Sequence, residues 1–312
     1  MKPSRLLLPT ACAALAVTGL TLTTASGTPA PPAAAASEAP ATLPTEGLDI
    51  LLTNDDGWNA PGISAVFDAL TAAGHHVTMV APAANQSGVS AQVQFYGAVT
   101  VTERGPDRWS VTTTPAGTVH FAMDQLFAGE RPDLVVSGTN VGQNTGFDTN
   151  YSGTVAAATV ASGAYGVPAV AISTATSYGR EAEAAYGETA DLLVEMIAAG
   201  LPELPRGEYL NVNYPVLSEA RPAPLGLVYA ENSQESLARI GFAQDPTDPS
   251  RYAIAPGLNP VQHAEGTDTK ELADGYVTVT VLEADRSVDA AKAPAVLQLL
   301  HGMEKRLAKA AR

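Results

Sequence analysis

Residues 48–57 read LDILLTNDDG, an apolar run that ends in a polar cluster. Such a run is typical of a buried strand that delivers side chains at its carboxyl end. Pro61 then opens a predicted helix, whose apolar residues recur at the helical period: Ile63, Val66, Phe67 and Leu70. A second apolar run at 77–81 follows at about the spacing of one βαβ unit, so the stretch predicts a parallel sheet.

The rest of the body continues this alternation. We expect strands at 133–137, 167–172 and 276–282, and helices at 119–127, 154–163, 181–199 and 290–311. The pattern predicts a doubly wound α/β domain, in which ligands gather beyond the carboxyl ends of the strands. Residues 218–275 hold many Pro, Gly and polar residues, and we expect an irregular excursion or a β-rich arm there.

Composition limits the function classes. The chain has 312 residues, of which 46% are hydrophobic and 16% charged, so it can bury a large core. Lys and Arg total 17 against 32 Asp and Glu, a net charge of -15, which argues against a nucleic-acid duplex or an anionic membrane as the main partner. A single cysteine, Cys12, excludes a disulfide framework and a cysteine-based zinc site.

The N-terminus predicts export. Lys2 and Arg5 precede an uncharged, largely apolar run at 6–25 that ends in small residues, so we expect a signal peptide at 1–27, and a secreted protein without a membrane attachment once it is cleaved. Pro9 argues against a spanning anchor and against a lipoprotein acylated at Cys12. Residues 28–47, rich in Ala and Pro, predict a linker ahead of a domain at 48–285, and 286–312 hold the closing helix.

Polar side chains follow three of the predicted strands. Asp55 and Asp56 are adjacent carboxylates, and a shared divalent cation would relieve their repulsion. The alternative is an Asx-turn or a helix cap. Residues 85–88 and 137–140 add amide and hydroxyl oxygens at the same edge of the sheet, a ligand set that suits Mg, Mn or Ca better than zinc.

A helix start follows this cluster. Residues 144–154 run into an apolar helix that Ser152 or Thr154 can cap, and free N–H groups at such a start can bind an anion. The alternative is that Ser152 only caps. Beside a metal, an anion site of this kind points to phosphoryl chemistry. His263, in the irregular region, is a candidate substrate contact from a long loop.

Four common signatures are missing from the sequence: G-x-x-x-x-G-K-[ST], G-x-G-x-x-G, G-x-S-x-G and H-E-x-x-H. Motif support is therefore lacking for a P-loop NTPase, a Rossmann dehydrogenase, an α/β-hydrolase and a zincin.

Five blocks of sequence together resemble the SurE family of stationary-phase survival proteins, which are metal-dependent 5'(3')-nucleotidases. They are ILLTNDDGWNAPGI at 50–63, NQSGVSAQ at 85–92, SGTNVGQNTGFDTNYSGTVAAA at 137–158, LNVNYP at 210–215 and TDTKELADGYVTVTVLEAD at 267–285. The resemblance implies a three-layer α/β/α fold with a Rossmann-like, mostly parallel sheet. It also implies an extended C-terminal arm at 218–275 that exchanges between subunits of a homodimer or tetramer.

The resemblance also assigns roles to residues. It implies one divalent metal ion per subunit, Mg or Mn and less commonly Ca, held by four residues: Asp55, Asp56, Ser87 and Asn140. It places Asn144, Ser152, Gly153 and Thr154 around the substrate phosphate, and we add Asn54, beside the acidic pair, to these contacts.

The predicted reaction is release of phosphate from nucleoside monophosphates by a secreted phosphomonoesterase. Asp55 and Asp56 are the predicted catalytic residues; either can act as base, and direct attack by one of them is an open variant. The alternatives are an exopolyphosphatase, a broad acid phosphatase, or a catalytically silent secreted protein that binds nucleotides in the same cleft.

Overall fold

The computed structural model describes residues 41–310 except 178–179, 182–183, 261 and 289. Within them lies a nine-stranded sheet with the order β3-β4-β2-β1-β5-β6-β7-β11-β8. Five neighbouring strands in its centre run parallel: β2 (His76–Pro82), β1 (Asp49–Thr53), β5 (Leu134–Val141), β6 (Ala169–Thr174) and β7 (Glu208–Tyr214). The predicted α/β class with a mostly parallel sheet is confirmed.

Short strands complete the two edges of the sheet. At one edge β4 (Arg108–Val111) runs parallel to β2, and β3 (Val101–Gly105) pairs antiparallel with β4. At the other edge β11 (Val277–Glu283) pairs antiparallel with β7, and β8 (Leu227–Tyr229) runs parallel to β11.

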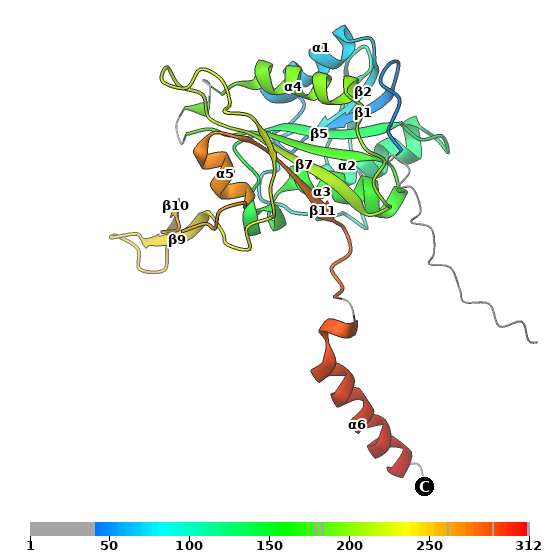
Figure 1. Cartoon of the computed structure of the whole chain (residues 1–312), viewed down its shortest axis with the longest axis vertical. Helices are drawn as coiled ribbons and strands as arrows, with labels where there is room; N and C mark the ends of the chain where they lie inside the picture. The colour runs from blue at the N-terminus through cyan, green and yellow to red at the C-terminus, as the bar shows by residue number, and fades with distance from the viewer. Residues whose placement is uncertain (1–40, 178–179, 182–183, 261, 289, 311–312) are drawn as a thin grey trace, which may run out of the picture. The chain divides into compact units, whose positions relative to one another are not determined.

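Helices cover both faces of the sheet (Figure 1). One layer holds α1 (Pro61–Ala72) and α4 (Tyr186–Ala198). The other holds α2 (Pro115–Phe121) and α3 (Gly153–Val160), which continue into π-helical turns at Ala122–Leu126 and Ala161–Tyr165. Three layers result, in agreement with the expected α/β/α arrangement.

Alternate residues of β1 enter different cores. Ile50 and Leu52 pack in the core under α1 and α4, and Leu51 packs in the core under α2 and α3. All three side chains are fully buried, and burial of each such side chain contributes about 1.5–3 kcal/mol. Successive side chains of a strand point to opposite faces, so the central residues of a strand buried on both faces must be apolar, as Ile50, Leu51 and Leu52 of β1 are.

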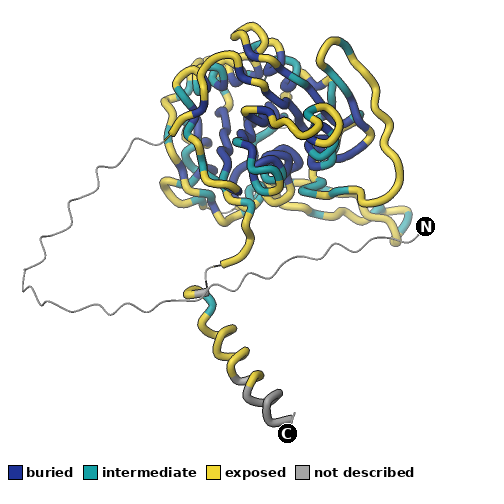
Figure 2. The backbone as a smooth tube through the Cα atoms, turned by 90° about the vertical axis from the view of Figure 1, so that its right-hand side faces the viewer, coloured by how far each residue is buried: buried dark blue, intermediate teal, exposed yellow. Residues whose placement is uncertain are grey.

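The arm at 218–275 is mostly extended chain. It holds β8, an antiparallel hairpin of β9 (Ala238–Gln244) and β10 (Tyr252–Leu258), and the short helix α5 (Asp268–Asp274) that packs beside β11. After β11 come a 3₁₀ turn at Ala290–Lys292 and α6 (Pro294–Ala310). Figure 2 shows buried backbone in the centre of the body and exposed backbone along the first turns of α6.

The predicted signal peptide and residues 28–40 of the predicted linker lie outside the described residues. The last residues of that linker belong to the folded body: Leu43 is buried, and its N–H donates to the carbonyl oxygen of Leu201 at 2.9 Å. The body therefore begins before the predicted boundary at 48, because Leu43 supplies an apolar side chain to the core. None of the helices described here has the length and apolar character to cross a membrane.

Candidate active site

The acidic pair lies at the carboxyl end of β1, held by a tight turn. The buried Asn54 side chain donates from Nδ2 to the carbonyl oxygen of Gly57 at 3.0 Å, and Gly57 donates its N–H to Asn54 Oδ1 at 3.2 Å. Gly57 has a φ of 106°, in the region that favours glycine. Asn54, predicted at the phosphate, thus uses both polar ends of its side chain to shape the turn that presents Asp55 and Asp56.

Asp55 is tied to the first turn of α3. Its Oδ1 accepts a 2.7 Å hydrogen bond from the Thr154 hydroxyl, and its Oδ2 accepts one of 3.2 Å from the Gly153 N–H. A Cβ atom at position 153 would lie 2.7 Å from Cβ of Asp55, so only glycine allows this approach. The positive end of the helix dipole favours a carboxylate here.

Asp56 is tied to the end of β5. Its Oδ2 accepts a 2.9 Å hydrogen bond from the N–H of Val141. The preceding residue, Asn140, donates from Nδ2 to the carbonyl oxygens of Val141 and Gly142, which leaves its Oδ1 as an available oxygen ligand. The structure thus brings Asp56 and the backbone beside Asn140 together across neighbouring strands.

Both carboxyl groups are destabilised as anions. Burial raises the pKa of Asp55, which is only 3% exposed. Burial and then the charge of Asp55 raise the pKa of Asp56 to about 6. In the described part of the chain no Lys, Arg or His forms an ion pair with either carboxylate. No described side chain therefore supplies the positive charge that would stabilise both carboxylates.

The donor chemistry fits a hard divalent cation. Among the described residues no cluster of three or more His, Cys, Asp or Glu side chains forms a metal site. Two carboxylates completed by neutral oxygens are a set that Mg, Mn or Ca accepts and zinc does not prefer. The residues present therefore fit the metal that the sequence predicts, and Asn140 Oδ1 is an available neutral oxygen on the residue next to Val141, which binds Asp56.

The loop after β2 carries the fourth predicted metal ligand. Gln86 donates its N–H to the carbonyl oxygen of Asp55 at 2.7 Å, which holds this loop against the acidic pair. Ser87 is exposed, and its N–H donates to Asn85 Oδ1 at 2.9 Å. No hydrogen bond of the described residues joins the Ser87 hydroxyl to Asp55 or Asp56.

The residues predicted at the phosphate divide into two groups. Gly153 and Thr154 contact Asp55 directly, and Ser152 caps α3 by accepting the N–H of Val155 at 3.1 Å. Asn144 instead faces the next strand and donates from Nδ2 to Ser173 Oγ at 2.9 Å. The N-terminus of α3 and the acidic pair thus form one compact unit, and Asn144 lies farther along the edge of the sheet.

Sequence reasoning missed the groups that support Asn144. Asn211 and Asn213 on β7 both donate to its carbonyl oxygen, at 2.8 and 3.0 Å, and Asn213 Oδ1 accepts its N–H at 2.8 Å. Both asparagines are fully buried. Their spacing of two residues in an apolar strand, visible in LNVNYP, could have signalled a polar network on one face. The backbone N–H of Val141, which orients Asp56, leaves no trace in the sequence.

Residues 50–238 match the family model described as survival protein SurE. The 5'-nucleotidase SurE of Geobacter sulfurreducens is 39% identical over 241 residues, which cover 76% of this chain and 88% of that protein. The 5'-nucleotidase SurE 1 of Burkholderia lata is 36% identical over 78% of this chain and 93% of its own length. The crystal structure of the SurE protein from Aquifex aeolicus is similar with a TM-score of 0.67 and 32% identity, over 81% of this chain and 99% of that one.

Proposed function

The chain belongs to the SurE family of survival proteins, and we propose that it is a divalent-metal-dependent 5'-nucleotidase that releases phosphate from nucleoside monophosphates. One observation carries the proposal: the buried Asp55 accepts hydrogen bonds from the first turn of α3, and beside it the half-buried Asp56 accepts one from the end of β5, while no described Lys, Arg or His forms an ion pair with either carboxylate. Relatives named 5'-nucleotidase that align over most of their length support the substrate class.

The metal would be held by Asp55 and Asp56, with Asn140 and Ser87 supplying neutral oxygens. A divalent cation bound there supplies charge neutralisation and Lewis acidity toward a phosphate oxygen. We propose Mg or Mn because the ligands are oxygens only. Thr154 fixes Asp55, and Val141 fixes Asp56, so both carboxylates stay oriented without rearrangement.

We propose that Asp56 is the group that accepts the proton. Its Oδ2 is engaged by the Val141 N–H, whereas no hydrogen bond of the described residues involves its Oδ1. This oxygen can accept a proton of the water that attacks phosphorus, while the P–O ester bond breaks and the ester oxygen leaves with the nucleoside and takes up a proton from solvent. In the alternative route the same oxygen attacks phosphorus directly, which forms an aspartyl phosphate and releases the nucleoside. Acid quenching of a single turnover distinguishes the two routes, because only direct attack leaves phosphate covalently bound to the protein.

We also propose that the mature protein is exported and forms a homo-oligomer. The charged start and apolar run at 1–27 support export. Exposed apolar side chains on the β9–β10 hairpin support association: Ile240, Phe242, Ile254 and Leu258 are 59–72% exposed. Mass spectrometry of the secreted protein and light scattering test these two points.

A substrate panel tests the proposed activity. Phosphate release is measured with nucleoside 5'- and 3'-monophosphates, polyphosphate and simple phosphate esters, each with Mg, with Mn and with a chelator. We expect nucleotides to be hydrolysed only with metal. Preference for polyphosphate would indicate an exopolyphosphatase, and binding without release would indicate a silent nucleotide-binding protein.

A further inference from the structure

A cavity of about 570 Å³ lies at the carboxyl edge of the sheet. The ends of β5, β6 and β7 line one side of it, and the arm and α5 line the other. Gln143 on its wall is two residues beyond Val141, whose N–H binds Asp56, so the Cα atoms of these two residues are at most about 7 Å apart. The cavity is thus placed to hold the remainder of a molecule whose phosphate lies at Asp56.

Unpartnered polar atoms gather at this cavity. Thr145 is only 1% exposed, yet its hydroxyl has no hydrogen-bond partner among the described residues. His263 and Arg221 are half-buried residues, but Nε2 of His263 and Nε of Arg221 are buried atoms that also have no hydrogen-bond partner among the described residues, and all three residues line the cavity. Buried polar groups in native proteins are nearly always partnered, so three such atoms around one cavity indicate a ligand with hydrogen-bonding groups.

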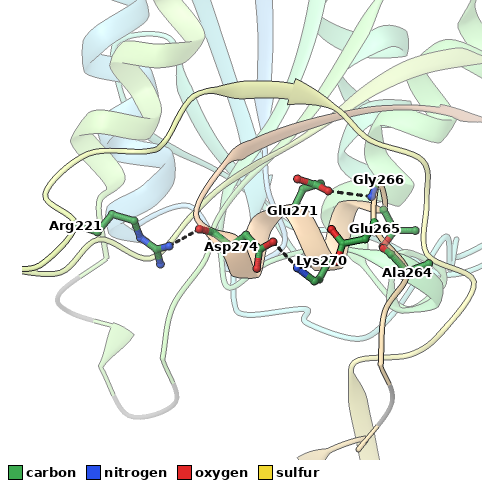
Figure 3. Close-up of polar contacts among 8 residues, drawn as sticks. Arg221, Ala264, Glu265, Gly266, Lys270, Glu271 and Asp274 are labelled. Atoms are coloured by element: carbon green, nitrogen blue, oxygen red, sulfur yellow. Dashed lines mark hydrogen bonds and ion pairs between the residues drawn. The ribbon is translucent and has the colours of Figure 1, made fainter.

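The positive charge near the cavity is already engaged. Lys270 forms ion pairs with Asp274 and with Glu265, and Arg221 donates from Nη1 to the carbonyl oxygen of Asp274 at 2.6 Å (Figure 3). The charge of Lys270 is thus paired, and the guanidinium of Arg221 is the remaining positive group in a lining that otherwise offers hydrogen bonds, apolar surface and the Glu265 carboxylate. Such a lining disfavours a second phosphate or a polyphosphate chain, and it suits an uncharged heterocycle and sugar.

Buried hydrogen bonds fix the wall that the arm supplies. The fully buried Asp268, at the start of α5, accepts N–H groups from Gly146 and Ser233, both at 2.9 Å. Ser233 Oγ lies 3.0 Å from Nδ1 of His263, which orients the imidazole and leaves Nε2 for a ligand. His263, Lys270 and their neighbours lie beyond residue 238, where the match to the family model ends.

We propose that this cavity binds the nucleoside part of the substrate, with Thr145 and His263 as its specificity-determining contacts. The inference rests on the proposed nucleotidase function and adds the residues that separate nucleotides from simple phosphate esters. Thr145 and His263 contact base or sugar, and the reacting phosphate stays with Asp55 and Asp56.

The test compares Thr145→Val and the double variant T145V/H263F with wild type and with Arg251→Gln, a control on the exposed hairpin. For each protein kcat/KM is measured for nucleoside monophosphates and for glycerol 2-phosphate. We expect the ratio of the two to fall about five- to ten-fold in T145V, the size of one hydrogen bond to an uncharged group, and about 30-fold or more in the double variant. The change should lie in KM, and R251Q should keep the wild-type ratio.

Valine leaves the shape of residue 145 nearly unchanged and removes an unpartnered hydroxyl, so the thermal midpoint of T145V should equal or exceed that of wild type. A second readout is calorimetric titration of adenosine, guanosine and uridine in the presence of a chelator. Wild type and R251Q should bind at least one nucleoside, and T145V/H263F should bind it at least ten-fold more weakly.

Any of three results would overturn the inference. The ratio of kcat/KM for nucleotides to that for glycerol 2-phosphate could be unchanged in T145V and the double variant, or it could fall equally in R251Q. The third result is a wild-type kcat/KM for glycerol 2-phosphate within two-fold of that for the best nucleotide. Failure of the wild type to release phosphate from any substrate with Mg or Mn would instead overturn the proposed function. In that case nucleoside binding without metal still decides whether the cavity is a nucleoside site.

Discussion

The hydroxyl of Thr154 donates to Oδ1 of Asp55 at 2.7 Å, across 99 residues of chain. This bond joins the first turn of α3 to the end of β1, so the helix start and the acidic pair form a single rigid unit. Thr154, first assigned to the phosphate, therefore also acts as a positioning residue for a metal ligand.

Thr154→Val tests this positioning role. Valine preserves the shape but removes a hydrogen bond to a charged group, which is worth about 1.5–3 kcal/mol. We expect kcat/KM for nucleotides to fall about ten- to 100-fold and the metal concentration for half-maximal activity to rise. Thr159→Val, one turn later on α3, should retain activity. Equal effects of the two substitutions would assign the loss to the helix and not to Asp55.

Asp56→Asn tests the acidic pair. The amide oxygen can still accept the N–H of Val141, but one of the two repelling charges is gone. We expect activity to fall at least about 100-fold, because metal binding and the proposed proton acceptor are both impaired. The thermal midpoint of the metal-free variant should be no lower than that of wild type. Near-wild-type turnover with Mg or Mn would refute the assignment of Asp56.

Metal binding should stabilise the fold as well as activate it. A cation that binds only the native state, at about 100 times its Kd, adds about 2.7 kcal/mol to the free energy of unfolding. Differential scanning calorimetry with and without Mn should therefore show a higher midpoint with metal for wild type. D56N should show little increase, and an equal increase in both would place the stabilising metal elsewhere.

His75 should make stability depend on pH. Burial, and then the neighbouring His76, lowers its pKa below the ordinary value of 6.5, and its Nδ1 lies 3.3 Å from the Leu48 N–H, which it accepts when neutral. His76 itself is exposed beside Asp49. At a pH between the lowered pKa of His75 in the folded protein and its ordinary pKa in the unfolded chain, the unfolded chain binds more protons than the folded one. The contribution of His75 to the free energy of unfolding is therefore complete above about pH 6.5 and is lost as the pH falls through the folded pKa.

Urea unfolding at pH 7.5 and pH 5 measures this dependence. The non-titrating variant His75→Asn should lose less free energy of unfolding over that interval than wild type. If both proteins lose the same amount, His75 does not contribute, and the dependence belongs to other groups.

The substitution Leu51→Ala tests how much burial in the core contributes to the free energy of unfolding. The side chain of Leu51 is fully buried under α2 and α3, and Leu51→Ala should lower the free energy of unfolding by about 2–5 kcal/mol. Leu225 is 60% exposed, and Leu225→Ala should change the free energy of unfolding by less than about 0.5 kcal/mol. Chemical denaturation of the two variants gives the comparison, and similar values would contradict the assigned burial.

Local signals predicted the strand and the helix that flank the acidic pair. Pro61 begins α1 as the sequence indicates, and the apolar run before Asp55 is the central strand β1. These features depend on propensity and periodicity within a few residues, which the sequence displays directly. The predicted helix at 181–199 instead begins at Tyr186, and the short edge strands β3 and β4 carry too few residues for a clear pattern.

Contacts between distant segments were not predictable in the same way. The sequence predicts Asn54 as a phosphate contact, and in the structure its side chain forms hydrogen bonds with the backbone of Gly57, three residues along the chain. Asp268 showed no signal as a buried group, because its partners, Gly146 and Ser233, lie in separate segments. Such roles depend on which loops the fold brings together, and a single sequence does not encode that as a local period.

Asp268 also determines how the arm behaves over time. Moving the arm away from the sheet would leave a buried carboxylate without the N–H groups of Gly146 and Ser233, which is costly unless water replaces them. These two hydrogen bonds therefore hold the arm against the sheet. The amide protons of Gly146 and Ser233 should accordingly exchange with solvent at the slow rate of the core, although Gly146 only begins a short 3₁₀ turn and Ser233 lies in a loop.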